Sequence, residues 1–309
     1  AAAKEIKQRL YALFAVLGIV IFFWFSFHQN GMSLSFFARD FVDSSAVAPE
    51  VWQAINPFFV IVLTPIIMAI FGALARKGKE PSAPRKIAYG MLVAAIGFVV
   101  MAIGSDGLNT PNEQQRAIAV DKAETFAKEY YAIAPTAEAL EAMNEDAEYA
   151  ATVKPATDFM GKLTKNTKPI FFDVYNAQAV IASTDAVENS AAVAEATATL
   201  EAIKADTKTE TRTSPYWLIF TYLILTFAEL LLSPMGISFV SKVAPPKLKG
   251  LMMGGWFVAT AIGNMLVAVG GFLWAGLPLW SVWTVFIALC LISALFMFVM
   301  MKRLESVTK

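Results

Sequence analysis

Glu229 is the only acidic residue deep within a long apolar stretch, in the segment LTFAELLLSP. A carboxylate there could pair with a cationic group or carry a proton. A charge at the centre of a bilayer costs about 2.5–3.5 kcal/mol, so an ionisable residue in such a stretch predicts a functional site. Ser233 follows one helical turn later, on the same face. The alternative is a structural glutamate whose hydrogen bonds are satisfied by neighbouring helices.

His28 and Asn56 are polar residues in two further apolar stretches. Histidine changes charge near physiological pH, which suits a proton relay, and Trp24 precedes His28 by one helical turn. A neutral, hydrogen-bonding histidine is the alternative. Asn56 stands before Pro57 and suits a contact between helices as well as a contact with a substrate.

Pro234 and Gly236, which follow Glu229 in the sequence, predict a bend in its helix. Pro234 removes a backbone hydrogen bond and Gly236 weakens the helix beyond it, so we expect a kink and a gating hinge there. Other chemistries are excluded by counting, because the chain has one histidine and one cysteine. A Cys/His zinc site and a disulfide each need more, and no nucleophile–base pair or phosphate loop is present. We therefore expect neither an enzyme nor a cofactor.

The elements that must position these residues are membrane-spanning helices. The chain has 309 residues, of which 57% are hydrophobic and 16% charged, against about 25% charged in soluble domains. Most of its apolar runs reach the roughly 20 residues that cross a bilayer as a helix, and the third is short. These runs are 10–36, 52–75, 87–104, 216–241, 250–274 and 279–301.

The formal net charge of zero conceals two unlike parts. Residues 106–213 hold 18 acidic and 10 basic residues, and the remainder holds 7 acidic and 15 basic ones. The sequence therefore predicts three transmembrane helices in 1–105, a water-soluble insert in 106–213 and three more helices in 214–309. The insert reads as mainly helical: Thr110 and Glu113 fit a capping box, and further starts are predicted at Thr136 and Thr184. The stretch 169–180 fits either a helix or a strand.

Basic residues gather in alternate loops of this series. Because such loops face the cytoplasm, we expect both termini to be cytoplasmic and the insert to be periplasmic or extracellular. The lipid bilayer is the expected surrounding, and no nucleic-acid partner is expected. The basic residues are Lys4, Lys7, Arg9, Arg76, Lys77, Lys79, Arg85, Lys86, Lys242, Lys247, Lys249, Lys302, Arg303 and Lys309.

Long segments of both flanks resemble one family. Glu229 to Pro246 (ELLLSPMGISFVSKVAPP) and Leu251 to Asn264 (LMMGGWFVATAIGN) resemble helices ten and eleven of the proton-dependent oligopeptide transporters of the major facilitator superfamily. Phe23 to Ala38 resembles helix seven, Gln53 to Ile61 the start of helix eight, and Pro84 to Gly97 helix nine. The insert is not covered.

The resemblance implies an all-α fold of two six-helix bundles, of which this chain is the second, with the N-terminal six-helix bundle as its partner. It implies proton-coupled symport of di- and tripeptides by alternating access across a bacterial cytoplasmic (inner) membrane. Protons would be the coupling ion, and no other cofactor is implied.

The resemblance also assigns roles to residues. Glu229 aligns with the glutamate that binds the peptide amino terminus, Asn56 with an asparagine that assists it, and Ser233 lies beside them. Trp24 and Trp256 align with aromatic residues that line the pocket.

His28 marks a departure, because the family usually has Glu-Gln where this chain has His28 and Gln29. That glutamate is tied to proton binding and to a salt bridge with a first-bundle arginine. His28 and Glu229 are the candidate proton-coupling residues, although a protonated histidine would repel that arginine.

Two alternatives to peptide transport remain. One is transport of another solute, such as nitrate or a modified peptide, on the same fold. The other is a membrane-anchored interaction protein that uses the outer insert.

Overall fold

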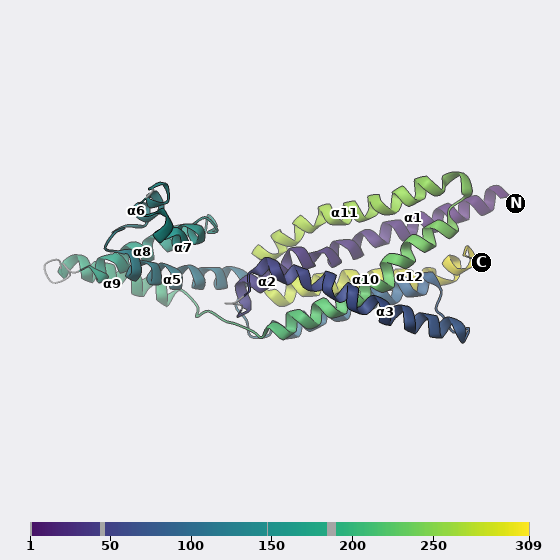
Figure 1. Cartoon of the computed structure of the whole chain (residues 1–309), viewed down its shortest axis with the longest axis horizontal. Coiled ribbons are helices and arrows are strands. Elements are labelled where there is room, and N and C mark those ends of the chain that lie inside the picture. The colour runs from purple at the N-terminus through teal and green to yellow at the C-terminus, as the bar shows by residue number, and fades with distance from the viewer. Residues whose placement is uncertain (1, 44–46, 147, 184–189, 309) are drawn as a thin grey trace. The chain divides into compact units, whose positions relative to one another are not determined.

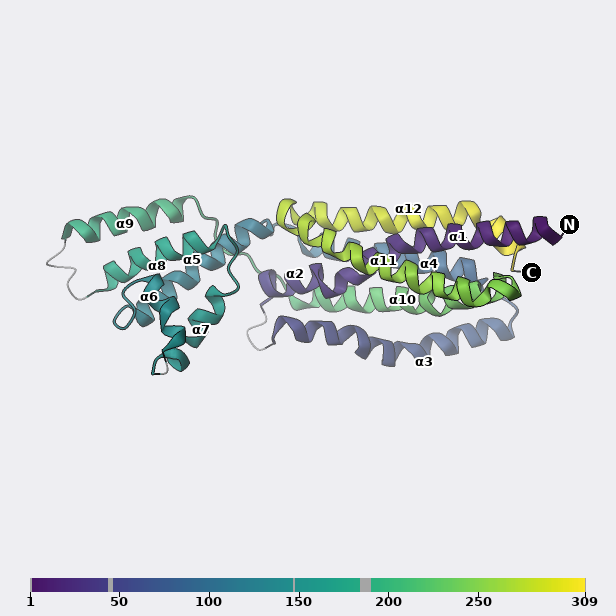
Figure 2. The ribbon, with the colours of Figure 1, turned by 90° about the horizontal axis from the view of Figure 1, so that it is seen from above.

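The computed structural model describes residues 2–43, 47–146, 148–183 and 190–308. The chain divides into two compact units (Figures 1 and 2). The first comprises Ala1–Leu108 and Arg212–Lys309, and the second comprises Asn109–Thr211.

Long apolar helices make up the first unit. Among the described residues, six segments are long and apolar enough to cross a membrane, which confirms the predicted number of spans. Their elements are α1 (Ala2–Phe27), η1 (His28–Gly31), α2 (Ser33–Phe41), η2 (Pro49–Ala54), α3 (Ile55–Arg76), α4 (Ala83–Gly104), α10 (Pro215–Val243), η5 (Pro246–Leu248), α11 (Lys249–Gly276) and α12 (Leu279–Ser306).

The third span is longer than predicted, with 22 residues in α4. The prediction that it lies near the lower length limit was wrong, because the helix takes in two basic residues at its start. Lys86 is only 4% exposed. Its ammonium pairs with Glu80 and lies 4.2 Å from the centre of the Phe71 ring. Because Glu80 and Phe71 accommodate the charge, Lys86 can lie inside α4, although its charge had suggested that the helix begins after it.

The first span is interrupted. The 3-10 turn η1 separates α1 from the short helix α2, and Gly31 and Met32 stand at the break. The buried Gln29 bridges it: its Nε2 donates to the Phe25 carbonyl over 3.3 Å, and its Oε1 accepts from the Ser33 hydroxyl over 2.7 Å. Short 3-10 segments within helices often mark hinges.

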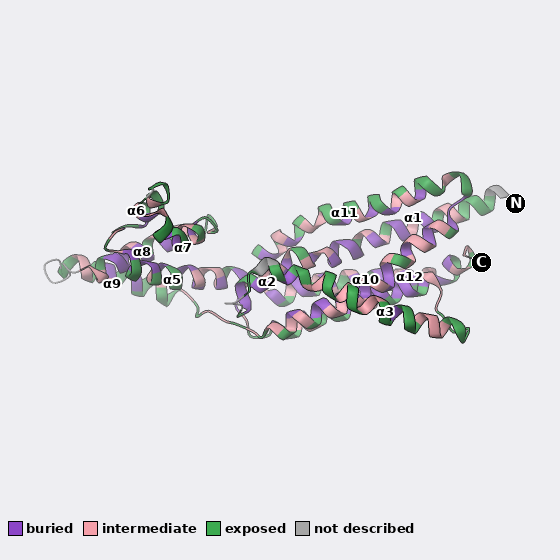
Figure 3. Cartoon of the chain, in the orientation of Figure 1, coloured by how far each residue is buried: buried purple, intermediate pink, exposed green. Residues whose placement is uncertain are grey.

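Glycines let α4 lie closely against α10. Gly90, Gly97 and Gly104 are spaced by seven residues along α4. A Cβ at Gly90 would lie 2.9 Å from the Ala228 carbonyl oxygen, and one at Gly97 would lie 3.1 Å from Leu225. Small residues allow close backbone approach between membrane helices. Figure 3 shows how the buried residues are distributed over the labelled helices, α10 among them.

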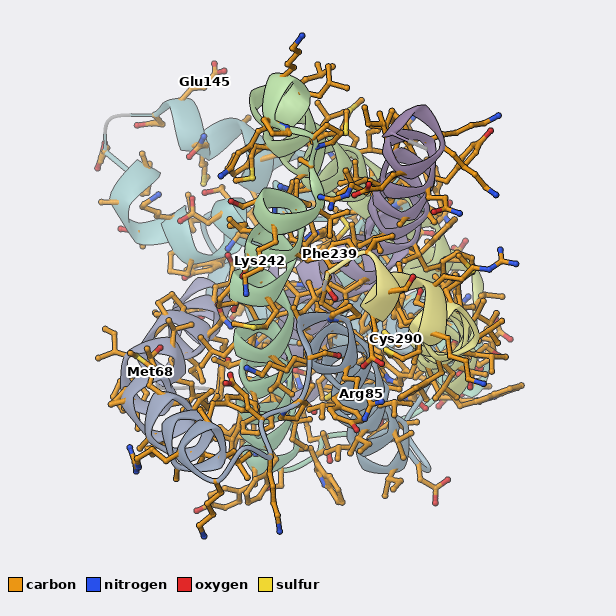
Figure 4. The ribbon with its side chains drawn as sticks, turned by 90° about the vertical axis from the view of Figure 1, so that its right-hand side faces the viewer. Met68, Arg85, Glu145, Phe239, Lys242 and Cys290 are labelled. Carbon is orange, nitrogen blue, oxygen red and sulfur yellow. The ribbon has the colours of Figure 1, made fainter. Side chains whose placement is uncertain are left out.

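Helix α3 is the least buried of the spans. Its only buried residue among those described is Ile67, whereas Ile61 is 74% exposed. Figure 2 shows it beside α10 at the edge of the helices, and Figure 4 shows Met68 pointing away from them while Phe239 lies inside. Most of the apolar surface of α3 is therefore left for lipid or another protein surface to cover.

The second unit is helical. Its elements are α5 (Pro111–Tyr130), α6 (Ala137–Ala142), η3 (Met143–Glu145), α7 (Ala150–Met160), α8 (Lys168–Ala182) and α9 (Ser190–Ala205). The predicted capping box is confirmed, as is the cap at Thr136, and the ambiguous stretch 169–180 lies within helix α8. The start predicted at Thr184 lies outside the described residues.

An aromatic and aliphatic core holds the second unit together. Phe171, Val174 and Tyr175 of α8 are fully buried and pack against α5. The Tyr175 hydroxyl donates to the Ala134 carbonyl over 2.8 Å, and the Tyr130 hydroxyl donates to the Thr152 carbonyl over 3.2 Å. Because both hydroxyls have acceptors, these tyrosines can be buried without leaving a polar group unsatisfied.

The start of α5 predicts a local dependence on pH. Hydrogen bonds from Lys208 and from Thr110 hold the pKa of Glu113 below its usual range. Because the pKa is lower in the folded state, the stabilisation is present near neutral pH and is lost as the pH falls below about 4.5. We expect the amide protection of residues 110–114 to fall in that window.

Hydrogen exchange measured at several pH values, corrected for the intrinsic rates, tests this expectation. In Glu113→Gln the corrected amide protection of residues 110–114 should no longer fall as the pH is lowered, since the glutamine amide retains the capping geometry without a titrating group. A wild type and a variant with the same pH dependence would contradict the role of Glu113.

Candidate functional site

Glu229 is held by a side chain from another span. The Asn56 Nδ2 of α3 donates to the Glu229 Oε2 over 3.3 Å and to the Thr226 hydroxyl over 2.9 Å. The Thr226 hydroxyl in turn donates to the Tyr222 carbonyl within α10. One amide therefore fixes the carboxylate of a half-buried glutamate across two helices.

One face of α10 carries the predicted site residues. Glu229, Ser233 and Gly236 follow at helical spacing, and α10 continues as a helix through Pro234. The buried Trp256 packs directly against Gly236, because a Cβ at this position would collide with the indole ring. The glycine therefore has a packing role in addition to the flexibility predicted for it.

The predicted aromatic residues form a contiguous group. Trp24 and His28 stack with ring centres 5.1 Å apart and planes 19° apart. Trp24 meets Trp256 edge to face, with ring centres 6.4 Å apart. Both tryptophans are almost fully buried. Residues from α1 and α11 thus build one aromatic surface that ends at His28.

The register of the helices places Glu229 at the depth of Trp24. The Tyr222 hydroxyl donates to the Asn30 carbonyl over 2.9 Å, which fixes one level. Gly236 of α10 contacts Trp256 of α11, and Gly255, which precedes Trp256, faces Leu17 of α1. These contacts place Gly236 and Leu17 at a second common depth, two helical turns from Glu229. Glu229 lies midway between these levels along α10, as Trp24 does along α1, and both helices rise about 1.5 Å per residue.

This arrangement offers a carboxylate and aromatic surfaces at one depth. A half-buried carboxylate can pair with a cationic group, and indole rings provide apolar contact area. The Trp24 Nε1–H is buried and has no acceptor among the described residues. In the same part of the chain, no group of three or more His, Cys, Asp or Glu side chains is gathered to hold a metal ion.

Thr226 and Gln29 are site residues that the sequence did not reveal to us. Thr226 precedes Glu229 by three residues, so the helical face shared by the two was a usable signal. Gln29 is fully buried and fills the space beside Gly270, where a Cβ would collide with its amide. It fixes the 3-10 turn η1, which begins at His28.

A family model and several relatives match the chain. The model described as PTR2, POT family, matches residues 1–122 and 187–271. The peptide transporter YePEPT of Yersinia enterocolitica is 25% identical over 273 residues, which cover 87% of this chain and 34% of that protein. The dipeptide and tripeptide permease B of Salmonella typhimurium is 32% identical over 117 residues, 35% of this chain and 24% of that protein.

Solved structures share the fold. A crystal structure of a peptide transporter POT in complex with sulfate has a TM-score of 0.59 at 17% identity and covers 98% of this chain and 42% of that one. The POT family transporter PepTSo has a TM-score of 0.56 at 17% identity, with 99% and 44% covered. Some curated relatives match this chain along most of its length. The chain spans about a third of the length of those relatives.

The family model covers more than half of the residues, and its two matched segments include the helices that carry Glu229, Asn56, Trp24 and Trp256. The long apolar helices agree with the all-helical fold of the solved members. The chain is therefore a multi-pass membrane protein that belongs to the POT family, a family of transporters and not of enzymes, in the major facilitator superfamily.

Proposed function

We propose that this chain is the C-terminal six-helix half of a proton-coupled symporter of di- and tripeptides. The observation that carries the proposal is the Glu229 carboxylate held by Asn56 between α10 and α3, at the depth of the aromatic group. The names of the matched relatives, a peptide transporter and di- and tripeptide permeases, favour peptides as the substrates.

Each site residue has a place in this proposal. Glu229 pairs with the ammonium group of the peptide, and Asn56 orients the carboxylate. Ser233 lies one turn away on the same helix face, and the almost fully buried rings of Trp24 and Trp256 support the wall of the peptide pocket. Basic residues of the N-terminal six-helix bundle, the expected partner, hold the peptide carboxylate. The two bundles rock about this site, and α10 bends near Pro234 and Gly236.

The proposed setting is a bacterial cytoplasmic membrane. Residues 1–105 and 214–309 supply the helices equivalent to seven to nine and ten to twelve, with both termini cytoplasmic. The insert, residues 106–213, lies on the periplasmic side. The distribution of basic residues among the loops supports this orientation.

Uptake of a radiolabelled dipeptide by the full-length transporter in proteoliposomes, driven by an inward proton gradient, tests the proposal. We expect unlabelled di- and tripeptides to compete with the label and nitrate to leave uptake unchanged. Competition by nitrate, or the absence of gradient-driven peptide uptake, would instead favour another solute.

His28 predicts a specific pH dependence of uptake. Histidine is the side chain whose charge change most often lies near physiological pH. We expect gradient-driven uptake by the wild type to change with pH, and His28→Gln to lose this change. Counterflow exchange, which needs no proton gradient, should persist in the variant. Identical pH profiles of the two proteins would mean that His28 has only a structural role.

A further inference from the structure

Residues 212–213, here called the strap, hold the end of α2. The Thr213 amide donates to the Phe41 carbonyl over 2.8 Å, and the Arg212 Nη1 donates to the Val42 carbonyl over 3.1 Å. Val42 and Thr213 form an isolated parallel β-bridge. The Thr213 hydroxyl also donates to the Gly104 carbonyl at the end of α4, over 3.2 Å. The strap therefore fastens α2 to the end of another span.

Helix α2 is a separate segment that can turn about η1. The 3-10 turn divides it from α1, and its nine residues follow Met32, which is not helical. Its other end, at Phe41, is the point that the strap holds. Because α2 is hinged at η1 and held at Phe41, the strap determines the position of α2.

The residue that precedes the strap is clamped inside the insert. The Gln114 Oε1 accepts from the Thr211 amide over 3.0 Å, and the Gln114 Nε2 donates to the Thr211 carbonyl over 2.8 Å. Asn109 donates through Nδ2 to Gln114 over 3.1 Å and to the Thr209 carbonyl over 2.8 Å. Gln114 is fully buried, and Asn109 is 8% exposed. Thr211 is thus fixed at both its backbone polar groups.

The clamp and the strap are consecutive along the chain. Thr211 belongs to the second unit, and Arg212 begins the strap in the first, so a single peptide bond joins the two sets of hydrogen bonds. Any loosening of Thr211 lengthens the free chain that ends in the strap. The folded state of the insert therefore sets how freely the chain can move where the strap begins.

We propose that the strap is a latch through which the insert controls α2: the segment swings about η1 only when residues 212–213 release it, and the clamp on Thr211 sets how firmly they hold. This inference rests on the proposed function, because alternating access is the process that requires the proposed outer segment of the first span to move. The insert would then be a regulatory module of the transport cycle.

A reversible cross-link tests the release step. We replace Val42 and Thr213 by cysteine in the full-length transporter, since paired positions of a β-bridge approach the Cα spacing that a disulfide accepts. Oxidation with copper phenanthroline should reduce dipeptide uptake at least tenfold, and dithiothreitol should restore it. The two single-cysteine variants, treated identically, should keep their uptake. Uptake that persists in protein shown by mass spectrometry to be cross-linked would overturn the latch.

Hydrogen exchange tests the role of the insert without relying on transport. In Gln114→Ala we expect residues 33–42 to exchange at least threefold faster than in the wild type, while the core of the insert at 171–175 keeps its protection. The exposed charge-removing variant Lys154→Ala, in α7 of the same insert, should leave residues 33–42 unchanged.

A second clamp variant guards against unfolding. If Gln114→Ala loses protection at 171–175, Asn109→Ala replaces it, since that change removes only two of the clamp hydrogen bonds. Unchanged exchange of residues 33–42 in a folded clamp variant would overturn the control of α2 by the insert. A transporter that fails to take up peptides, yet shows the faster exchange, would contradict the proposed substrate and retain the latch.

Discussion

Glu229→Gln is expected to lower dipeptide uptake by about a hundredfold or more. Truncating one partner of a buried, hydrogen-bonded charge pair typically costs 2–5 kcal/mol. A loss of about 2.7 kcal/mol corresponds to a hundredfold change. Asn56 holds the Glu229 carboxylate at 3.3 Å, so the charge that would meet a peptide ammonium is fixed in place. Glutamine keeps the shape and removes the charge.

The form of the substrate sharpens this test. The wild type should strongly prefer a dipeptide with a free amino terminus to its N-acetylated form, because acetylation removes the ammonium. Glu229→Gln should lose most of that preference. Glu145→Gln, which removes an exposed charge from the insert, serves as the control and should transport normally. Unchanged uptake and unchanged preference in Glu229→Gln would remove Glu229 from the substrate site.

Gly236→Ala is expected to destabilise the first unit and to abolish uptake. The added methyl group would occupy the position of the Trp256 indole, which is 2% exposed and also contacts Trp24. Overpacking of this kind typically costs 1–3 kcal/mol. Because Trp256 also contacts Trp24, we expect any shift of the indole to disturb the aromatic group. Thermal unfolding of the purified transporter in detergent should show a lower midpoint, by several degrees.

Gly254→Ala is the matched control. It makes the same substitution in α11, where a Cβ would meet nothing within 4 Å. Because alanine is the better helix former, we expect an unchanged or slightly higher unfolding midpoint and normal uptake. Equal midpoints for the two variants would show that the contact between Gly236 and Trp256 carries no strain.

The helical spans could be predicted because apolar runs in a membrane have few alternatives to a helix. The start of α4 could not, since Lys86 looks like a loop residue until Glu80 and Phe71 are seen to enclose it. The caps at Thr110 and Thr136 were readable because each motif lies within four consecutive residues.

The site residues, too, could be predicted where the signal is local and were missed where it depends on contacts between distant segments. Glu229 and His28 stand out as ionisable residues in apolar surroundings, and the resemblance to a family supplied the role of Asn56. Thr226 was missed because its part in the site depends on the register between α3 and α10. The strap has no signal in the local sequence, since its partners at Phe41 and Gly104 are remote in sequence.

The poorly buried α3 has a consequence for how the protein is made. Among the described residues, α3 fastens to the rest of its unit mainly along α10, with Asn56 as a polar link, and it exposes large apolar side chains on its other sides. A nascent chain that has inserted these helices displays that surface until lipid or another protein surface covers it. Exposed apolar patches mark surfaces that contact lipid or another protein, so α3 is the side of the unit on which an incompletely assembled chain is most prone to unintended contacts.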